Sequence, residues 1–295
     1  MIKNSKVADV ALFITAVIWG TGFIGVEYAI ETGASPALIV TMRFLIAGIL
    51  LGILYCKSLK NIDKETLKVG VIAGTMLFGG FYLQTWGQSH AATVSNSSFI
   101  TATNVVMVPF IVWFFTKKKP RTKYFVLGSL ALIGSAILSI NLSEGFVFQI
   151  GEFVILLSAV CFALHIAYLG IWGREVDSKL LTFLQMIVSG LLALLFMILF
   201  DRESMDIVLV KAALPSTVYL AVFSSCVCYY LQTTAQQHTS PSKTGIILCL
   251  EGFFGSFFAV LLGIDSLSVT LVIGGAIIIS SAILSEVEFP VRKKK

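Results

Sequence analysis

The nonapeptide YLQTWGQSH (residues 82–90) returns 148 residues later as YLQTTAQQH (residues 230–238), with six of nine positions identical. The identical positions include two glutamines and a histidine, whereas chance matches in apolar sequence involve mostly leucine and isoleucine. Each copy closes the third long apolar stretch of its half of the chain. The sequence is therefore predicted to contain an internal duplication, with one repeat over residues 7–140 and a second over residues 150–286.

The composition indicates a membrane protein. Of the 295 residues 57% are hydrophobic and 13% charged, with a mean hydropathy of +0.93, whereas soluble domains carry about 25% charged residues. A membrane-spanning helix needs about 20 apolar residues, and lipid admits only helices and closed barrels. Ten stretches have helical length, so an all-α integral membrane fold with ten transmembrane helices is predicted. They are residues 7–26, 35–56, 67–86, 94–115, 122–140, 150–171, 179–199, 213–234, 242–263 and 268–286.

Lysine and arginine residues predict the orientation, since they concentrate on the cytoplasmic side of a membrane. With a cytoplasmic N-terminus, 18 of the 21 basic residues fall on the cytoplasmic side, Arg202 and Lys211 fall outside, and Arg43 lies within a span. We therefore expect a multi-pass protein of the cell (plasma or inner) membrane with both termini cytoplasmic. Five helices per half is an odd number, so the halves are expected to be inverted repeats, an arrangement typical of alternating-access transporters.

Short motifs along nearly the whole chain resemble those of the EamA family of the drug/metabolite transporter (DMT) superfamily. They are IWGTGF (18–23), Arg43-Phe44, Pro109, LEGF (250–253), LGID (262–265) and IGG (273–275). Gly252 stands where the family usually has proline, and Asp265 where it usually has glutamate. The resemblance implies export of amino acids, other metabolites or toxic compounds, often driven by a proton gradient.

Two charged residues lie deep inside predicted spans, where an ionised group costs roughly 2.5–3.5 kcal/mol on insertion scales. Arg43 and Glu251 have opposite signs at similar depth. We hypothesise that they interact, or alternate between each other and the substrate; the alternative is a static clamp between helices. The 148-residue offset places Thr103 opposite Glu251, and Asn104 extends this polar patch.

Other candidate site residues are polar or aromatic side chains within the spans. The amides of Gln84 and Gln232 would bind a polar solute or a neighbouring helix, because an unpaired buried amide costs free energy. His165 is a candidate proton carrier. The aromatic candidates, which would line a pocket or pack between helices, are Trp19, Tyr82 and Tyr230.

The expected partners are a small-molecule substrate, the lipid bilayer and, as a candidate coupling ion, protons; the chain is expected to act as a monomer or homodimer. No cofactor or metal site is expected, because the five cysteines form no CxxC pair and the three histidines are widely separated. Scattered basic clusters argue against nucleic acid.

Secondary transport is the preferred function. The alternatives are a sugar-phosphate or nucleotide-sugar exchanger, which would need several intramembrane cations, and a channel. A membrane-embedded enzyme would need a cluster of His, Asp or Glu at one membrane face, so no enzymatic activity is expected.

Overall fold

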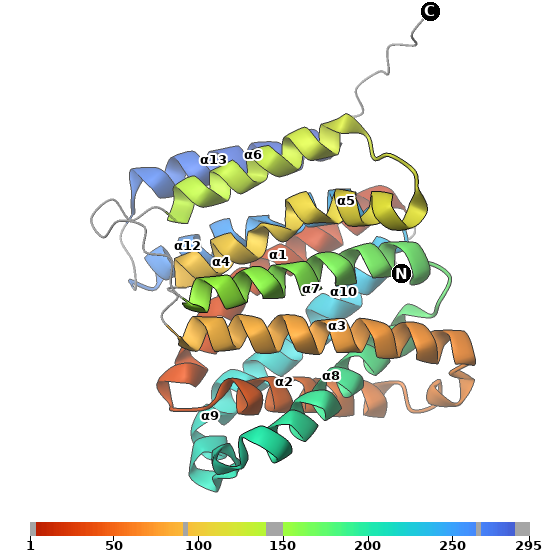
Figure 1. Ribbon diagram of the computed structural model, residues 1–295, viewed down its shortest axis with the longest axis vertical. Helices are drawn as coiled ribbons and strands as arrows, with labels where there is room; N and C mark the ends of the chain where they lie inside the picture. Colours follow the sequence, from red (N-terminus) through yellow and green to blue (C-terminus); the bar gives the residue numbers. More distant parts are fainter. Residues whose placement is uncertain (1–3, 91–93, 140–149, 264–266, 287–295) are drawn as a thin grey trace, which may run out of the picture.

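The computed structural model describes residues 4–90, 94–139, 150–263 and 267–286; Asp265 lies outside them. Over this part of the chain the regular structure is entirely helical (Figure 1). The helices are α1 (Ser5–Glu31), α2 (Pro36–Leu54), η1 (Leu59–Asn61), α3 (Lys64–Ser89), α4 (Val94–Ala102), α5 (Asn104–Thr116), α6 (Thr122–Ser139), α7 (Ile150–Trp172), α8 (Ser178–Phe200), η2 (Arg202–Met205), α9 (Ile207–Tyr219), η3 (Leu220–Val227), α10 (Cys228–Gln236), α11 (Pro241–Leu248), α12 (Leu250–Leu261) and α13 (Val269–Glu286).

The helices correspond to the ten predicted stretches, but not all of the stretches form a helix long enough to cross a membrane. Within the described residues, eight helical segments are long and apolar enough to cross a membrane. The other two apolar helices, at Thr122–Ile137 and Val269–Ser285, are shorter. The chain is thus a multi-pass membrane protein with eight candidate spans among the described residues, and the predicted count of ten depends on the two shorter helices.

Polar caps set where several helices begin. The side chains of Ser35 and Ser240 accept hydrogen bonds from the first turns of α2 and α11, and a proline follows each cap. Asp63 caps α3 in the same way. Hydrogen bonds from the hydroxyl and backbone N–H of Thr66 lower the pKa of the Asp63 carboxyl below its ordinary value.

Helix packing has the symmetry of a duplication. The second helices of the two halves, α2 and α8, pack together, and so do the fifth, α6 and α13 (Figure 1). The third helix of the first half, α3, lies along α7, the first helix of the second half. In the same way α1 lies along α9, η3 and α10, which form the third apolar segment of the second half. Exchanging the halves leaves this pattern of neighbours unchanged.

Three of the long apolar segments are interrupted near their middle. A break at Thr103 separates α4 from α5, and a break at Cys249 separates α11 from α12. The third segment contains η3, a stretch of π-helix (Leu220–Val227). Irregular backbone inside a membrane is tolerated where it lines a cavity, and π-helical turns occur often at functional sites. All three interruptions lie at the same place in the fold, around the cavity described next.

Candidate functional site

A cavity is lined by residues of α1, α2, α3, α4, α5, α7, η3, α10, α11 and α12. Its volume of about 50 Å³ is enough for a few water molecules or a small polar group. Seven of the ten candidate residues line it: Trp19, Arg43, Gln84, Asn104, His165, Gln232 and Glu251. The two halves of the chain both contribute, so the site lies at the interface between the repeats.

Arg43 is fully buried and is held by hydroxyl groups rather than by an acid. Its Nε donates to Ser225 Oγ at 3.2 Å and its Nη2 donates to Ser224 Oγ at 3.0 Å. The guanidinium also lies 4.2 Å from the ring centre of Phe81, a cation–π arrangement. Within the described chain the expected ion pair with Glu251 is not formed: the two side chains line the same cavity, but Arg43 donates its hydrogen bonds to η3.

The π-helical geometry of η3 also positions Trp19. The backbone N–H of Cys228 bonds to the carbonyl of Phe223, five residues back. The Ser224 carbonyl, which an α-helix would pair with Cys228, accepts a hydrogen bond from Trp19 Nε1 at 2.8 Å. Ser224 thus ties both α1 and the Arg43 guanidinium to η3, one through its carbonyl and the other through its hydroxyl.

Two acceptor groups at the cavity have no donor within the described part of the chain. Glu251 follows the helix break at Cys249 and is 8% exposed, and no residue in the described part of the chain forms a hydrogen bond or ion pair with its carboxylate. The amide nitrogen of Gln232 donates to Gln236 Oε1 at 3.1 Å, while Gln232 Oε1 is buried without a donor. Buried polar atoms are nearly always hydrogen-bonded, so these acceptors indicate a place for a ligand donor.

The neighbours of His165 determine which of its ring nitrogens carries a hydrogen. The amide nitrogen of Gln185 donates to Leu181 O and to Thr233 Oγ1, so Gln185 Oε1 is an acceptor. His165 Nε2, which lies 2.7 Å from that oxygen, must therefore donate. The imidazole edge also packs against Tyr229, with ring centres 5.8 Å apart. His165 Nδ1 remains as the nitrogen that can accept a proton.

Gln84 and Asn104 line the cavity from α3 and α5. The Gln84 amide nitrogen donates to Thr101 Oγ1 at 2.9 Å, which joins α3 to the last turn of α4. Asn104 is the first residue of α5, directly after the break at Thr103. The interrupted fourth segment therefore presents side chains from both sides of its break.

Three candidates lie outside the cavity. Tyr82 packs against Phe196 of α8, with ring centres 4.6 Å apart. Tyr230 lies beside Tyr55 at 6.5 Å. Thr103 donates its hydroxyl hydrogen to the carbonyl of Ile100 and so closes the break in the helix backbone.

The cavity also uses residues that the sequence reasoning did not select. Phe81, Phe162 and Tyr229 form an aromatic wall, with Phe81 in contact with both of the other rings. The hydroxyl pair Ser224 and Ser225 holds Arg43. The pair was visible in the sequence as two adjacent serines in the middle of a predicted span.

A duplicated helical fold with a polar cavity between its repeats defines a class of membrane transport proteins. The model of the EamA-like transporter family matches residues 6–140 and again residues 149–286. The chain belongs to this family, within the drug/metabolite transporter superfamily, and the resemblance of its motifs is confirmed. It is a membrane transporter.

Two relatives cover most of the chain. An uncharacterised transporter of Archaeoglobus fulgidus is 31% identical over 280 residues, which is 94% of this chain and 85% of the relative. The uncharacterised inner membrane transporter YicL of Salmonella typhimurium is 24% identical over 295 residues, which is 92% of this chain and 93% of the relative. The fold is also similar to that of a protein of known crystal structure, with a TM-score of 0.77 and 17% sequence identity. The match covers 95% of this chain and 97% of the chain in the crystal.

Proposed function

We propose that the protein is a secondary transporter that exports amino acids or similarly sized metabolites by alternating access, with proton coupling through Glu251. The observation that supports this is the cavity chemistry, in which donors and acceptors are separated. Arg43 offers N–H donors on one side, while Glu251 and Gln232 Oε1 offer unsatisfied acceptors.

A solute with a carboxylate and an ammonium group fits this separation of charge. A guanidinium has five N–H donors, and two of those of Arg43 are used by Ser224 and Ser225. The remaining donors suit a carboxylate, and the Glu251 carboxylate suits an ammonium. Arg43 is the one arginine or lysine among the lining residues, which disfavours sugar phosphates and nucleotide sugars.

Alternating access follows from the proposed inverted arrangement of the two halves. If all ten apolar segments cross the bilayer, five crossings per half place the halves in opposite orientations. The exchange symmetry of the helix neighbours and the cavity between the halves support this arrangement. Rocking of one half against the other then exposes the cavity first to one side of the membrane and then to the other.

Glu251 suits the role of coupling residue because its carboxylate has no protein partner within the described chain. An ionised and unpaired carboxylate is costly in a membrane interior. Glu251 therefore binds either a proton or the ammonium group of a solute, so that loading one favours release of the other. Such competition at one carboxylate couples export of the solute to entry of a proton.

The test compares the metabolites inside and outside cells that express the wild-type protein, Glu251→Gln or Glu203→Gln. Glu203 is an exposed glutamate of η2 and serves as the matched control. One class of solute should accumulate in the medium with the wild type and with Glu203→Gln but not with Glu251→Gln. The proposal is contradicted if the wild-type medium matches that of cells without the protein, or if Glu251→Gln exports normally.

A further inference from the structure

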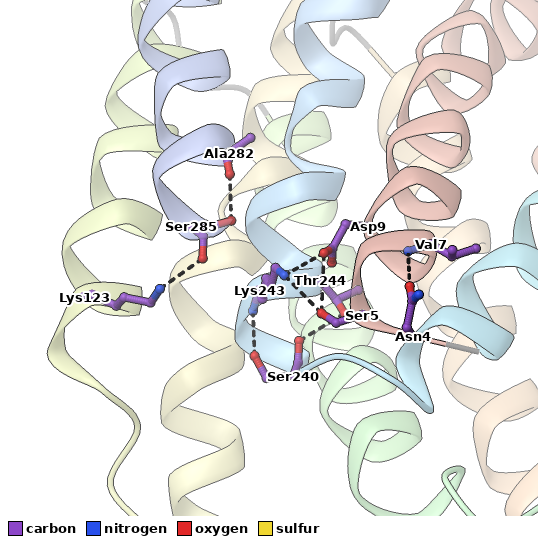
Figure 2. Close-up of polar contacts among 10 residues, drawn as sticks. All are labelled: Asn4, Ser5, Val7, Asp9, Lys123, Ser240, Lys243, Thr244, Ala282 and Ser285. Carbon is purple, nitrogen blue, oxygen red and sulfur yellow. Dashed lines mark hydrogen bonds and ion pairs between the residues drawn. The ribbon is translucent and has the colours of Figure 1, made fainter. Parts of the chain in front are cut away.

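An ion pair joins α1 and α11 at one end of the molecule. Lys243 Nζ and Asp9 Oδ2 lie 2.8 Å apart, and the two side chains are only 11% and 12% exposed. Figure 2 shows the pair pointing toward each other from the two helices. This is the one salt bridge seen between residues of the described chain. Neither Asp9 nor Lys243 lines the cavity.

The pair lies beyond one end of the cavity. Asp9 precedes Trp19 of the cavity by ten residues of α1, and Lys243 precedes Cys249 by six residues of α11. At about 1.5 Å per residue these separations are roughly 15 Å and 9 Å along the helices. Along the two helices, Leu12 and Ile246 lie between the pair and the cavity, and both side chains are fully buried within one apolar cluster. An apolar plug followed by an ion pair therefore closes this end.

Further contacts hold the same end together. Ser5 Oγ lies 3.5 Å from both Asp9 Oδ2 and Lys243 Nζ (Figure 2). The ring of Pro241, at the start of α11, packs against α7 so closely that a Cβ on Gly170 would lie 2.1 Å from it. The first turn of α11 thus contacts both α1 and α7 at this end of the cavity.

The opposite end of α1 is arranged differently. The cavity lining continues along α1 to Val26, and the next residue, Glu27, accepts a hydrogen bond from Gln88 at 2.7 Å. The contact there joins a carboxylate to a neutral amide, which attracts less strongly than a cation. Along α1, the contact at one end of the cavity thus joins two charged side chains, whereas the contact that Glu27 makes at the other end has a neutral donor.

The duplication shows the same asymmetry. Counted from the starts of the two family matches, at residues 6 and 149, Asp9 takes the same place as Glu152. The offset of the repeated nonapeptide assigns Ser95 to the position of Lys243. The acidic residue is present in both halves, whereas the position of Lys243 in the second half is occupied by a serine in the first.

We propose that the Asp9–Lys243 ion pair is the lock of the cytoplasmic gate, which must open for a solute to enter the cavity from the cytoplasm. This inference rests on the proposed alternating access and on the proposed orientation, which places the start of α1 in the cytoplasm. The lock favours the state with a closed cytoplasmic side, and separation of α1 from α11 breaks the pair and opens the plug.

The test uses Cys249 as a reporter, because it lines the cavity. In a variant whose other four cysteines are replaced by alanine, a membrane-impermeant methanethiosulfonate is applied to inverted vesicles, which expose the cytoplasmic side. Asp9→Asn and Lys243→Met should each raise the rate of Cys249 modification from that side about tenfold or more. In the charge-swapped protein, Asp9→Lys with Lys243→Asp, the rate of Cys249 modification should return to the wild-type value. That result would also show that the substituted chain folds.

Lys123→Met is the matched control. Lys123 Nζ donates to the carbonyl of Ser285 at 3.0 Å and joins α6 to α13, so this contact includes neither Asp9 nor Lys243 (Figure 2). This variant should leave the modification rate at the wild-type value. Equal rates for the wild type, Asp9→Asn and Lys243→Met overturn the lock. Transport assayed in the same vesicles separates the two proposals: normal transport with unchanged modification rejects the lock alone, and a lock without transport of any solute rejects the proposed function.

Discussion

Gly20 of α1 allows the closest approach between α1 and α12, the helix that carries Glu251. A Cβ built on Gly20 would lie 2.7 Å from the backbone nitrogen of Gly255 and 2.8 Å from the carbonyl carbon of Phe254. Ordinary Cβ contacts are at 3.4–4 Å, so Gly20→Ala must push the two backbones apart by roughly 0.7 Å or more. Overpacking of this kind costs about 1–3 kcal/mol.

The expected result is a lower midpoint of thermal unfolding in detergent. Each kcal/mol of lost stability lowers the unfolding midpoint by roughly 2–4 °C in chains of about 150–250 residues. A shift of at least about 2 °C is therefore expected. Transport should fall as well, because the displacement separates Trp19 from the α12 side of the cavity. The unfolding midpoint is measured by intrinsic fluorescence of the purified protein, and transport by efflux of the exported solute.

Gly245→Ala is the matched control. A Cβ on Gly245, in α11, would meet its nearest atom at 3.6 Å, an ordinary contact, and alanine is the better helix former by about 1 kcal/mol. This variant should be as stable as the wild type or slightly more stable. The steric reasoning is refuted if Gly20→Ala unfolds at the wild-type temperature, or if both variants lose the same stability.

Three further predictions concern single contacts. Ser224→Ala with Ser225→Ala should destabilise the protein strongly, because Arg43 loses two charge-assisted hydrogen bonds worth about 1.5–3 kcal/mol each; in the Arg43→Met background the same serine changes should cost much less, which a double-mutant cycle of unfolding measures. The Asp63 cap has a lowered pKa in the folded state, so its stabilising effect is present above the unfolded pKa of about 3.8 and is lost as the pH falls through the lower folded value. Unfolding midpoints of the wild type and Asp63→Ala should therefore differ at neutral pH and converge under strong acid; a constant difference would contradict the assignment. Tyr82→Phe should transport at the wild-type rate, since the ring lies outside the cavity, and a large loss would show that the site is wider than described.

The positions of the helices could be predicted from the sequence because lipid imposes one requirement on every span. Apolar runs of about 20 residues satisfy that requirement, and most of the observed helices begin and end near the predicted bounds. α1 continues to Glu31, past the predicted end at residue 26. This extra turn contains two glutamates, and one of them, Glu27, accepts a hydrogen bond from Gln88, a tertiary contact that hydropathy does not reveal.

Which side of a helix faces the cavity was predicted less well. Tyr82 and Gln84 were both assigned to the pocket, and so were Tyr230 and Gln232. Residues two apart on an α-helix point in nearly opposite directions, because 3.6 residues complete a turn. Both glutamines line the cavity and both tyrosines lie outside it, so the repeat behaves consistently in its two copies.

The local environment of Arg43 lay beyond sequence reasoning for a different reason. Equal depth in the membrane suggested Glu251 as its partner, but depth does not determine which helices are neighbours. η3 brings Ser224 and Ser225 to the guanidinium, and its π-helical backbone has no periodicity signal in so short a segment. The helix breaks at Thr103 and Cys249 likewise occur without a proline at the break.

The central claim is that the cavity holding Arg43 and Glu251 is the transport site. The most direct measurement reconstitutes the purified protein in proteoliposomes and follows the solute identified in the medium, with and without a pH gradient. Wild-type protein should move the solute against its own gradient when protons flow the other way, and Glu251→Gln should lose this response to pH. Equal, pH-dependent transport by the wild type and Glu251→Gln would contradict the claim.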